Sequence, residues 1–517
     1  MNARGRTDRG RAALVCVVSL VLASCTGGGS AKAGFHPALQ WGTCPSDVEI
    51  QYISRHQCGW LTVLQDRSEP QGKTIRLFVV KTWPVDIAPP PYFGSGFGDN
   101  LGDAVGYGSV AAGATRLGRI GYTLELRGTG HSEPSLACPE IDALSERAAS
   151  SLTGDASLMN DFLAGVKACR DRLTAQGVDP SDYDIGAAAQ DMEDFRVALG
   201  IDQWWNLGTQ GTSSRYLFEY LREFPDRVRA AFLDSPQFPQ IEEVTEGVDG
   251  TRYALNQLFE ACRTDTGCAK DFPDLEASWS EAMARLDRQP LRGSAQGLSG
   301  GKVDVVVDAG KFLRAARFAL GGDGPENLSS LPAMIVAAAD GRLSPRLATI
   351  EASDPPFCAG YRPLCSGQGF SLGAYLSVFC SDEAPFVDQT ALEAAAGDDP
   401  AFQAVFARDP YLAACAVWDV PASDPTVHQP VYTDVPLLLL LGQFDSFSPL
   451  SIAREGAKTF DNVEVLEIPG QTHNALGFND CPIAIRNDWI REPTSPPDIT
   501  CLKGMPSVPF ATGGMSS

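Results

Sequence analysis

The chain has 517 residues, 44% of them hydrophobic, and 41 basic residues stand against 64 acidic ones, for a net charge of −23. This excess of acidic residues argues against binding to nucleic acid or direct adhesion to anionic lipid headgroups. A chain of this length is too long for one simple hydrophobic core, so we expect two packed units.

The first 24 residues have the pattern of a signal peptide. Four arginines lie between residues 4 and 11, and an apolar run over residues 12–23 is too short to span a bilayer. The run ends in Leu-Ala-Ser followed by Cys25, an order that resembles the bacterial lipobox, in which such a cysteine is lipidated. We expect residues 1–24 to be removed, residues 25–43 to form a lipidated tether, and the protein to be exported and lipid-anchored to the outer face of the cell membrane. An ordinary secretory signal with an incidental cysteine is the alternative.

The cysteines also indicate an oxidising compartment. Of the 14 cysteines, Cys16 leaves with the signal and Cys25 is used for lipid, so an even number, 12, remain for disulfides. There is no CxxC motif and the five histidines are scattered, so we expect neither a metal site nor a cofactor. The simplest connectivity joins neighbours along the chain: Cys44–Cys58, Cys138–Cys169, Cys262–Cys268, Cys358–Cys365, Cys380–Cys415 and Cys481–Cys501.

The first half of the mature chain alternates strand-like and helix-like segments. Such alternation predicts an α/β fold, a mostly parallel sheet with helices on both faces, whose N-terminal part we assign to residues 44–236. The predicted strands are residues 60–65, 74–83, 120–126, 204–207 and 228–233, and the predicted helices are residues 184–199 and 215–224.

The alternation stops in the middle of the chain and then returns. Residues 237–430 are mainly helical in pattern, as in 312–320 and 331–339. The apolar run 435–441 is typical of a strand buried on both faces, and a helix (448–460) and a strand (463–468) follow it. We therefore expect residues 431–517 to complete the sheet. Residues 237–430 are expected to form a large helical insertion, which is typical of a lid over an active site.

Two residues near the C-terminus have the pattern of a catalytic acid and base. Asp445 follows the strand at 435–441, and His473 follows the strand at 463–468. Their separation of 28 residues is one strand–helix–strand unit, which brings both loops to the same sheet edge. An aspartate there can orient a histidine that acts as a general base.

Several short segments together resemble one family. They are Trp-Gly-Thr-Cys-Pro from residue 41, Arg-Gly-Thr-Gly-His-Ser-Glu-Pro from 127, Phe-Pro-Asp-Arg-Val from 224, Phe-Cys-Ser-Asp from 379, and the Asp445 and His473 loops. In order and spacing they resemble the secreted tripeptidyl aminopeptidase and proline iminopeptidase-like (TAP-like) α/β-hydrolases. The resemblance implies an α/β-hydrolase fold with a helical lid, and serine hydrolysis of peptides from the N-terminus without a metal.

The family's nucleophilic serine is missing from its expected position. In the family it lies on a Gly-x-Ser-x-Gly turn, 14 residues before the proline of the Pro-Asp-Arg-Val segment, and here that position is Gly211. Ser213 or Thr212 could substitute if the turn were shifted, although both residues also fit an N-cap of the following helix. The predicted oxyanion loop, Gly94, Ser95 and Gly96, lacks the family's proline, and Phe97 adds bulk beside it.

The sequence therefore leaves three functions open. The leading one is a catalytically inactive or impaired member of the family that binds peptides or small ligands in the cleft covered by the lid. The alternative is an active serine exopeptidase or esterase that uses Ser213 or Thr212 with His473 and Asp445. The third is an interaction module of the cell envelope, for which the sequence singles out no surface.

Overall fold

The computed structural model describes residues 35–48, 54–84, 95–97, 117–201, 205–297, 300–322, 325–353, 371–477, 479–505, 508 and 510–512. The predicted signal peptide, Cys25, most of the tether, Gly94 and the Cys358–Cys365 pair lie outside these ranges. Within them, no helix combines the length and the apolar character that a membrane crossing requires.

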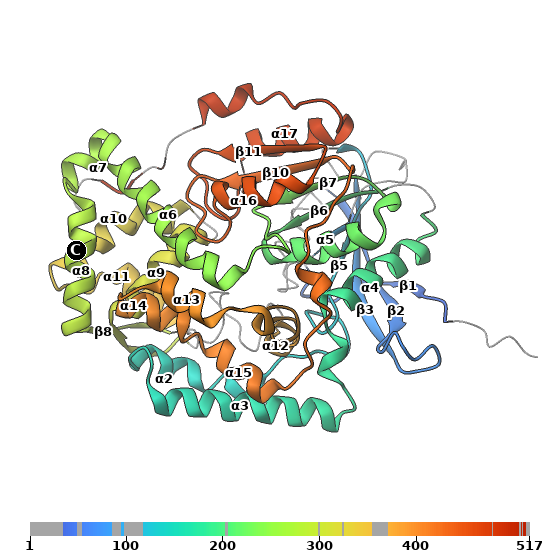
Figure 1. Cartoon of the computed structure of the whole chain (residues 1–517), viewed down its shortest axis with the longest axis horizontal. Helices are drawn as coiled ribbons and strands as arrows, with labels where there is room; N and C mark the ends of the chain where they lie inside the picture. The colour runs from blue at the N-terminus through green and yellow to red at the C-terminus, as the bar shows by residue number, and fades with distance from the viewer. Residues whose placement is uncertain are drawn as a thin grey trace, which may run out of the picture. The chain divides into compact units, whose positions relative to one another are not determined.

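One mixed sheet forms the centre of the fold (Figure 1). Its strands in the described part of the chain are β1 (Ala38–Gly42), β2 (Ser54–Leu64), β3 (Thr74–Pro84), β4 (Ser95–Phe97), β5 (Gly121–Leu124), β6 (Trp205–Gln210), β7 (Val228–Asp234), β10 (Leu437–Gly442) and β11 (Val463–Ile468). They lie in the order β1-β2-β3-β5-β4-β6-β7-β10-β11. β3 is antiparallel to both neighbours, whereas the strands from β5 to β11 are parallel. This order and these directions, with β1 added at the edge, are those of the α/β-hydrolase fold.

The leucine-rich strand β10 shows why the sheet is covered on both faces. Leu437, Leu439 and Leu441 pack in one hydrophobic cluster with α4 (Ile185–Ala198), α5 (Ser214–Glu223) and α16 (Leu450–Gly456). Leu438 and Leu440 point to the other face, where they pack with Trp489 and Ile490 of α17 (Asp480–Arg491). Because side chains alternate along a strand, an uninterrupted apolar run needs a helical layer on each side.

A long insertion separates β7 from β10, although the two strands are paired in the sheet. It contains a two-stranded hairpin, β8 (Leu291–Gln296) and β9 (Lys302–Val307), that the sequence did not suggest. Its helices are α6 (Glu243–Thr264), α7 (Thr266–Asp271), α8 (Leu275–Arg288), α9 (Ala309–Gly321), α10 (Pro325–Ala339), α11 (Pro345–Ser353), α12 (Leu372–Val378), α13 (Gln389–Ala396), α14 (Pro400–Phe402) and α15 (Pro410–Trp418).

The lid also includes helices from the N-terminal half, so packing does not follow the expected boundary at residue 237. α2 (Leu144–Ser150) and α3 (Ala156–Ala175) lie beside α15 in Figure 1, and α3 shares a hydrophobic cluster with α12 and α15. The expectation of two packed units needs a correction too. The insertion and the sheet have separate hydrophobic clusters, but the chain from His36 onward forms one compact unit.

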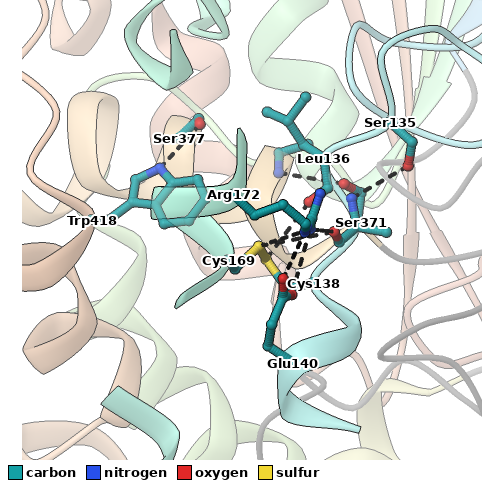
Figure 2. Close-up of a disulfide and its surroundings, with 11 residues drawn as sticks. Ser135, Leu136, Cys138, Glu140, Cys169, Arg172, Ser371, Ser377 and Trp418 are labelled. Atoms are coloured by element: carbon teal, nitrogen blue, oxygen red, sulfur yellow. Dashed lines mark hydrogen bonds and ion pairs between the residues drawn. A yellow bond between two sulfur atoms is a disulfide. The ribbon is translucent and has the colours of Figure 1, made fainter. Parts of the chain in front are cut away.

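Five of the six expected disulfides lie within the described ranges and form as neighbour pairing predicts. Cys138–Cys169 joins the segment before α2 to α3 (Figure 2). Around it, Arg172 donates to Glu140 (2.6 Å) and to the Ala137 carbonyl (2.7 Å), and Trp418 of α15 donates to Ser377 Oγ of α12 (3.1 Å). The other four pairs are Cys44–Cys58, Cys262–Cys268, Cys380–Cys415 and Cys481–Cys501.

Candidate active site

Asp445 lies in the loop that follows β10 and is fully buried. It accepts the backbone N–H groups of Phe447 (2.8 Å) and Ser448 (2.9 Å), which close a tight turn around its carboxylate. Burial alone would raise the pKa of Asp445, but the neighbouring His473 and these N–H groups outweigh burial and hold that pKa below its usual value. The residue is therefore built to remain an anion.

His473 follows β11 and faces this carboxylate. Its Nδ1 lies 3.0 Å from both Asp445 oxygens, so its Nε2 is directed away from Asp445. Asp234, at the end of β7, accepts the N–H groups of Ala475 (2.8 Å) and Leu476 (2.9 Å) and so fixes the loop that carries the histidine. Burial raises the pKa of Asp234 to about 7. Gly442 permits the close approach of the two loops, because a Cβ there would lie 1.8 Å from the Thr472 carbonyl oxygen.

Gly211 lies directly in front of the histidine, at the turn between β6 and α5. Its φ is +55°, in the left-handed region that favours glycine. A Cβ built on Gly211 would lie 2.8 Å from His473 Nε2. The backbone therefore places residue 211 opposite His473, at the position expected for a nucleophile, and this residue has no side chain.

The two candidate substitutes lie further along the same turn. Ser213 is fully buried and does not line the adjoining cavity, whereas Thr212 does. Ser213 makes no capping bond to α5, contrary to the N-cap interpretation. Ser214 organises the turn instead: its hydroxyl donates to the Gly211 carbonyl (2.7 Å) and accepts the Gln237 N–H (2.8 Å).

The oxyanion segment is described only in part. Ser95 and Gly96 belong to the short strand β4, where Gly96 pairs with Gly208 of β6. This pairing brings the backbone of the oxyanion segment to the strand that leads into the Gly211 turn. Gly94 lies outside the described residues.

A cavity of about 640 Å³ opens over Gly211 and His473 and is roofed by lid elements. The lid is hydrogen-bonded to the Asp445 loop and to the His473 loop through α9 and the residue after it. Ser446 Oγ, beside Asp445, donates to the Arg317 carbonyl (3.1 Å), and Thr472 Oγ1, beside His473, donates to the Gly322 carbonyl (2.8 Å). The cavity roof and the acid–base pair are thus one connected structure.

Three carboxyl groups that the sequence did not single out also line this cavity: Glu383, which is buried, and Glu243 and Asp409, which are half-buried. Glu383 Oε1 lies 2.6 Å from Nη1 of Arg215, whereas its buried Oε2 has no hydrogen-bond partner among the described residues. Burial raises the pKa of Glu383 to about 8 and that of Asp409 to about 6. The three residues come from separate elements, so only the neighbouring Phe-Cys-Ser-Asp segment could have hinted at them.

The described residues contain one grouping with metal-like spacing, Cys138, Glu140 and Cys169. Both sulfur atoms belong to the disulfide drawn in Figure 2, and Glu140 is paired with Arg172. A disulfide offers no thiolate, so this grouping is not a metal site.

Comparison with known proteins agrees with this geometry. Residues 399–501 match the family model described as TAP-like protein. The serine protease Hip1 of Mycobacterium tuberculosis is 27% identical over 288 residues, covering 50% of this chain and 52% of that protein, and Hip1 of Mycobacterium bovis matches equally. The chain thus spans about half the length of these curated relatives.

Solved structures with similar folds include the proline iminopeptidase of Mycobacterium smegmatis. It is 12% identical with a TM-score of 0.36, over 84% of this chain and 98% of that chain. A thermophilic esterase from Thermogutta terrifontis is 14% identical with a TM-score of 0.35, over 84% of this chain and 99% of that chain.

Proposed function

We propose, from the premise that this chain is an α/β-hydrolase of the TAP-like family related to the serine protease Hip1, that it has little or no hydrolase activity and binds peptides in its cavity. The observation that carries the proposal is the position of Gly211. A Cβ built on Gly211 would lie 2.8 Å from Nε2 of His473, the proposed base. Glycine has no side-chain atom that could attack a carbonyl group.

The chemistry of the remaining groups explains the loss. His473 can accept a proton at Nε2, and Asp445 can stabilise the resulting cation, but a general base accelerates acyl transfer mainly by activating a nucleophile. In a characterised serine protease, loss of the nucleophile lowers turnover by about a million-fold. What remains of the site is a shaped cavity, which can bind without cleaving.

The carboxyl groups that line the cavity support a peptide as the ligand. Glu243, Glu383 and Asp409 line one part of the cavity, where Arg215 and Arg317 are the cations that act on them. Glu383 Oε2 is buried without a hydrogen-bond partner among the described residues. The α-ammonium group of a peptide would donate a hydrogen bond to this oxygen and favour its charged form.

The intact acid–base pair favours a second candidate function, an active exopeptidase or esterase. Thr212 lines the cavity one residue beyond Gly211, and its hydroxyl would be the nucleophile. Ser213 would serve less readily, because it is fully buried. This candidate requires the turn to move toward His473.

We also propose that the protein is an exported lipoprotein. This location is supported by the N-terminal sequence, which has basic residues, an apolar run and the order Leu-Ala-Ser-Cys25. Mass spectrometry of the mature N-terminus should show cleavage after Ser24 and a lipid modification on Cys25. A mature chain that begins elsewhere without lipid would contradict it.

Calorimetric titration with tetra-alanine tests the main proposal. We expect saturable binding, with the peptide recovered intact by mass spectrometry after prolonged incubation. The N-acetylated peptide is the matched probe and should bind at least about tenfold more weakly, because it lacks the ammonium group. Rapid release of shorter peptides would instead support the active enzyme, and no binding at millimolar concentration would contradict a peptide-binding role.

A further inference from the structure

One face of helix α9 forms a basic wall of the cavity. Lys311, Arg314 and Arg317 are spaced three residues apart, and all three line the cavity. Residues three and four apart share a helix face, so these side chains form a single row. α9 contains no acidic residue, in a chain that has 64 of them.

The C-terminal end of α9 lies beside the catalytic residues. A Cβ on Gly321 would lie 2.1 Å from the Phe447 ring, and that ring packs edge-on against His473 with 5.0 Å between centroids. Arg314 lies seven residues earlier in the helix, which corresponds to about 10 Å along its axis. The helix therefore leads from the Gly211–His473 end of the cavity to a second end at Arg314.

The cations Lys311 and Arg314 share an acidic partner, Glu351, that lies outside the cavity lining. Arg314 Nη2 lies 3.3 Å from Glu351, which is buried and does not line the cavity. Lys311 donates to the Ala148 and Ala149 carbonyls (2.8 Å each) and lies 3.6 Å from Glu351, so its hydrogen bonds are already made within the protein.

Arg346 and Asn327 line the same cavity, and Arg346 lies five residues before Glu351, the partner of Arg314, on α11. Arg346 donates to the Asn327 side-chain oxygen, and both residues line the cavity. Guanidinium groups bind carboxylates in a two-pronged geometry, and an asparagine amide can donate an additional bond. The lining thus offers cations and hydrogen-bond donors, and its carboxylate Asp155 already accepts the Leu158 N–H as the cap of α3.

We propose that Arg314 and Arg346 bind the terminal carboxylate of a short peptide whose amino end lies near Glu243, Glu383 and Asp409. This inference rests on the proposed function and adds a ligand class: free peptides with both termini charged. An extended chain advances about 3.3 Å per residue, so about three residues cover the roughly 10 Å of α9 between Gly321 and Arg314. Longer chains and proteins would have to place an uncharged backbone against the basic end.

The test compares tetra-alanine with its C-terminal amide, which differs only in the charge of that end. We expect the free acid to bind at least about tenfold more tightly to the full chain. In both Arg314→Gln and Arg346→Gln the preference should fall to about threefold or less, with amide binding little changed. Arg342→Gln is the control, because Arg342 is exposed and does not line the cavity.

The outcomes separate this inference from the proposed function. Equal binding of acid and amide to the unaltered chain, or a preference that survives in both variants, would overturn the carboxylate site and leave peptide binding intact. Failure of both peptides to bind would overturn the proposed function and this inference together. If Arg314→Gln fails to fold because it leaves the buried Glu351 without its arginine, Arg346→Gln still provides the test, since Arg346 contacts the Asn327 amide.

Discussion

The two sides of the candidate active site differ in whether they carry the side chains expected of a serine hydrolase. On one side, Asp445 and His473 lie 3.0 Å apart, and backbone hydrogen bonds hold both of their loops. On the other side, the turn after β6 presents Gly211, where a Cβ would approach His473 Nε2 to 2.8 Å. The first side carries the proposed acid and base, and the second presents a residue without a side chain.

Asp445 and the two loops also have structural roles. Asp445 closes a turn, the loops of Asp445 and His473 both hold α9, and Asp234 anchors the chain just after His473. Removing Asp445 or Asp234 would leave backbone N–H donors unsatisfied whether or not the site reacts. Gly211 has no side chain and makes no such contacts.

The largest expected effect is the loss of stability in Asp445→Ala. The change removes the acceptor of two buried N–H groups and the partner of His473, so we expect the free energy of unfolding to fall by about 3 kcal/mol. Asp434→Ala is the control, because Asp434 is exposed beside the start of the same strand, and it should change stability by less than about 0.5 kcal/mol. Urea denaturation measures both variants. Similar small losses would show that the acid–base side has no structural role.

The pH dependence of stability should sharpen the contrast between Asp445 and the other buried carboxyl groups. Burial raises the pKa of Asp234 to about 7, of Asp382 to about 7, of Glu383 to about 8 and of Asp409 to about 6. Between about pH 4 and these values the folded state binds more protons than the unfolded state, so stability falls as pH rises. We expect a lower melting temperature at pH 8 than at pH 5, and a shallower decline in Glu383→Gln. A rising melting temperature over this range would contradict these assignments.

A smaller effect is expected for a methyl group at the nucleophile position. Gly211 and Gly200 both have positive φ, +55° and +66°, but a Cβ on Gly200 meets nothing within 4 Å. Gly200→Ala should therefore cost about 1 kcal/mol through backbone strain, and Gly211→Ala about 1 kcal/mol more, because it also displaces His473. Equal losses in thermal or urea unfolding would mean that the turn and the histidine are further apart than in this structure.

Much of the sheet could be predicted because its signals are local. The leucine run at β10 and the 28-residue separation of Asp445 and His473 place both loops at one edge. Some bounds differed: β6 continues to Gln210, and the helix expected over 448–460 is shorter, α16 ending at Gly456. The turn at Gly211 and the helix after β10 depend on packing between elements, which a window of sequence does not contain.

The features that define the cavity were harder to predict because they arise from distant parts of the chain. Glu243, Glu383 and Asp409 converge from three elements of the lid. The packing of α3 against α15 joins segments about 250 residues apart, and only the Cys138–Cys169 pairing hinted at the position of α3. The sequence shows that Lys311, Arg314 and Arg317 are three residues apart, but it does not show which face of α9 lines the cavity.

Labelling with a fluorophosphonate probe tests the contrast between the two sides most directly, because the probe reacts only with an activated serine or threonine. We expect no adduct after prolonged incubation, when the purified chain is analysed by intact mass and peptide mapping. His473→Ala should give the same result, since a base without a nucleophile activates no hydroxyl. One adduct per chain on Thr212 or Ser213 that disappears in His473→Ala would contradict the loss of the nucleophile and identify an active enzyme.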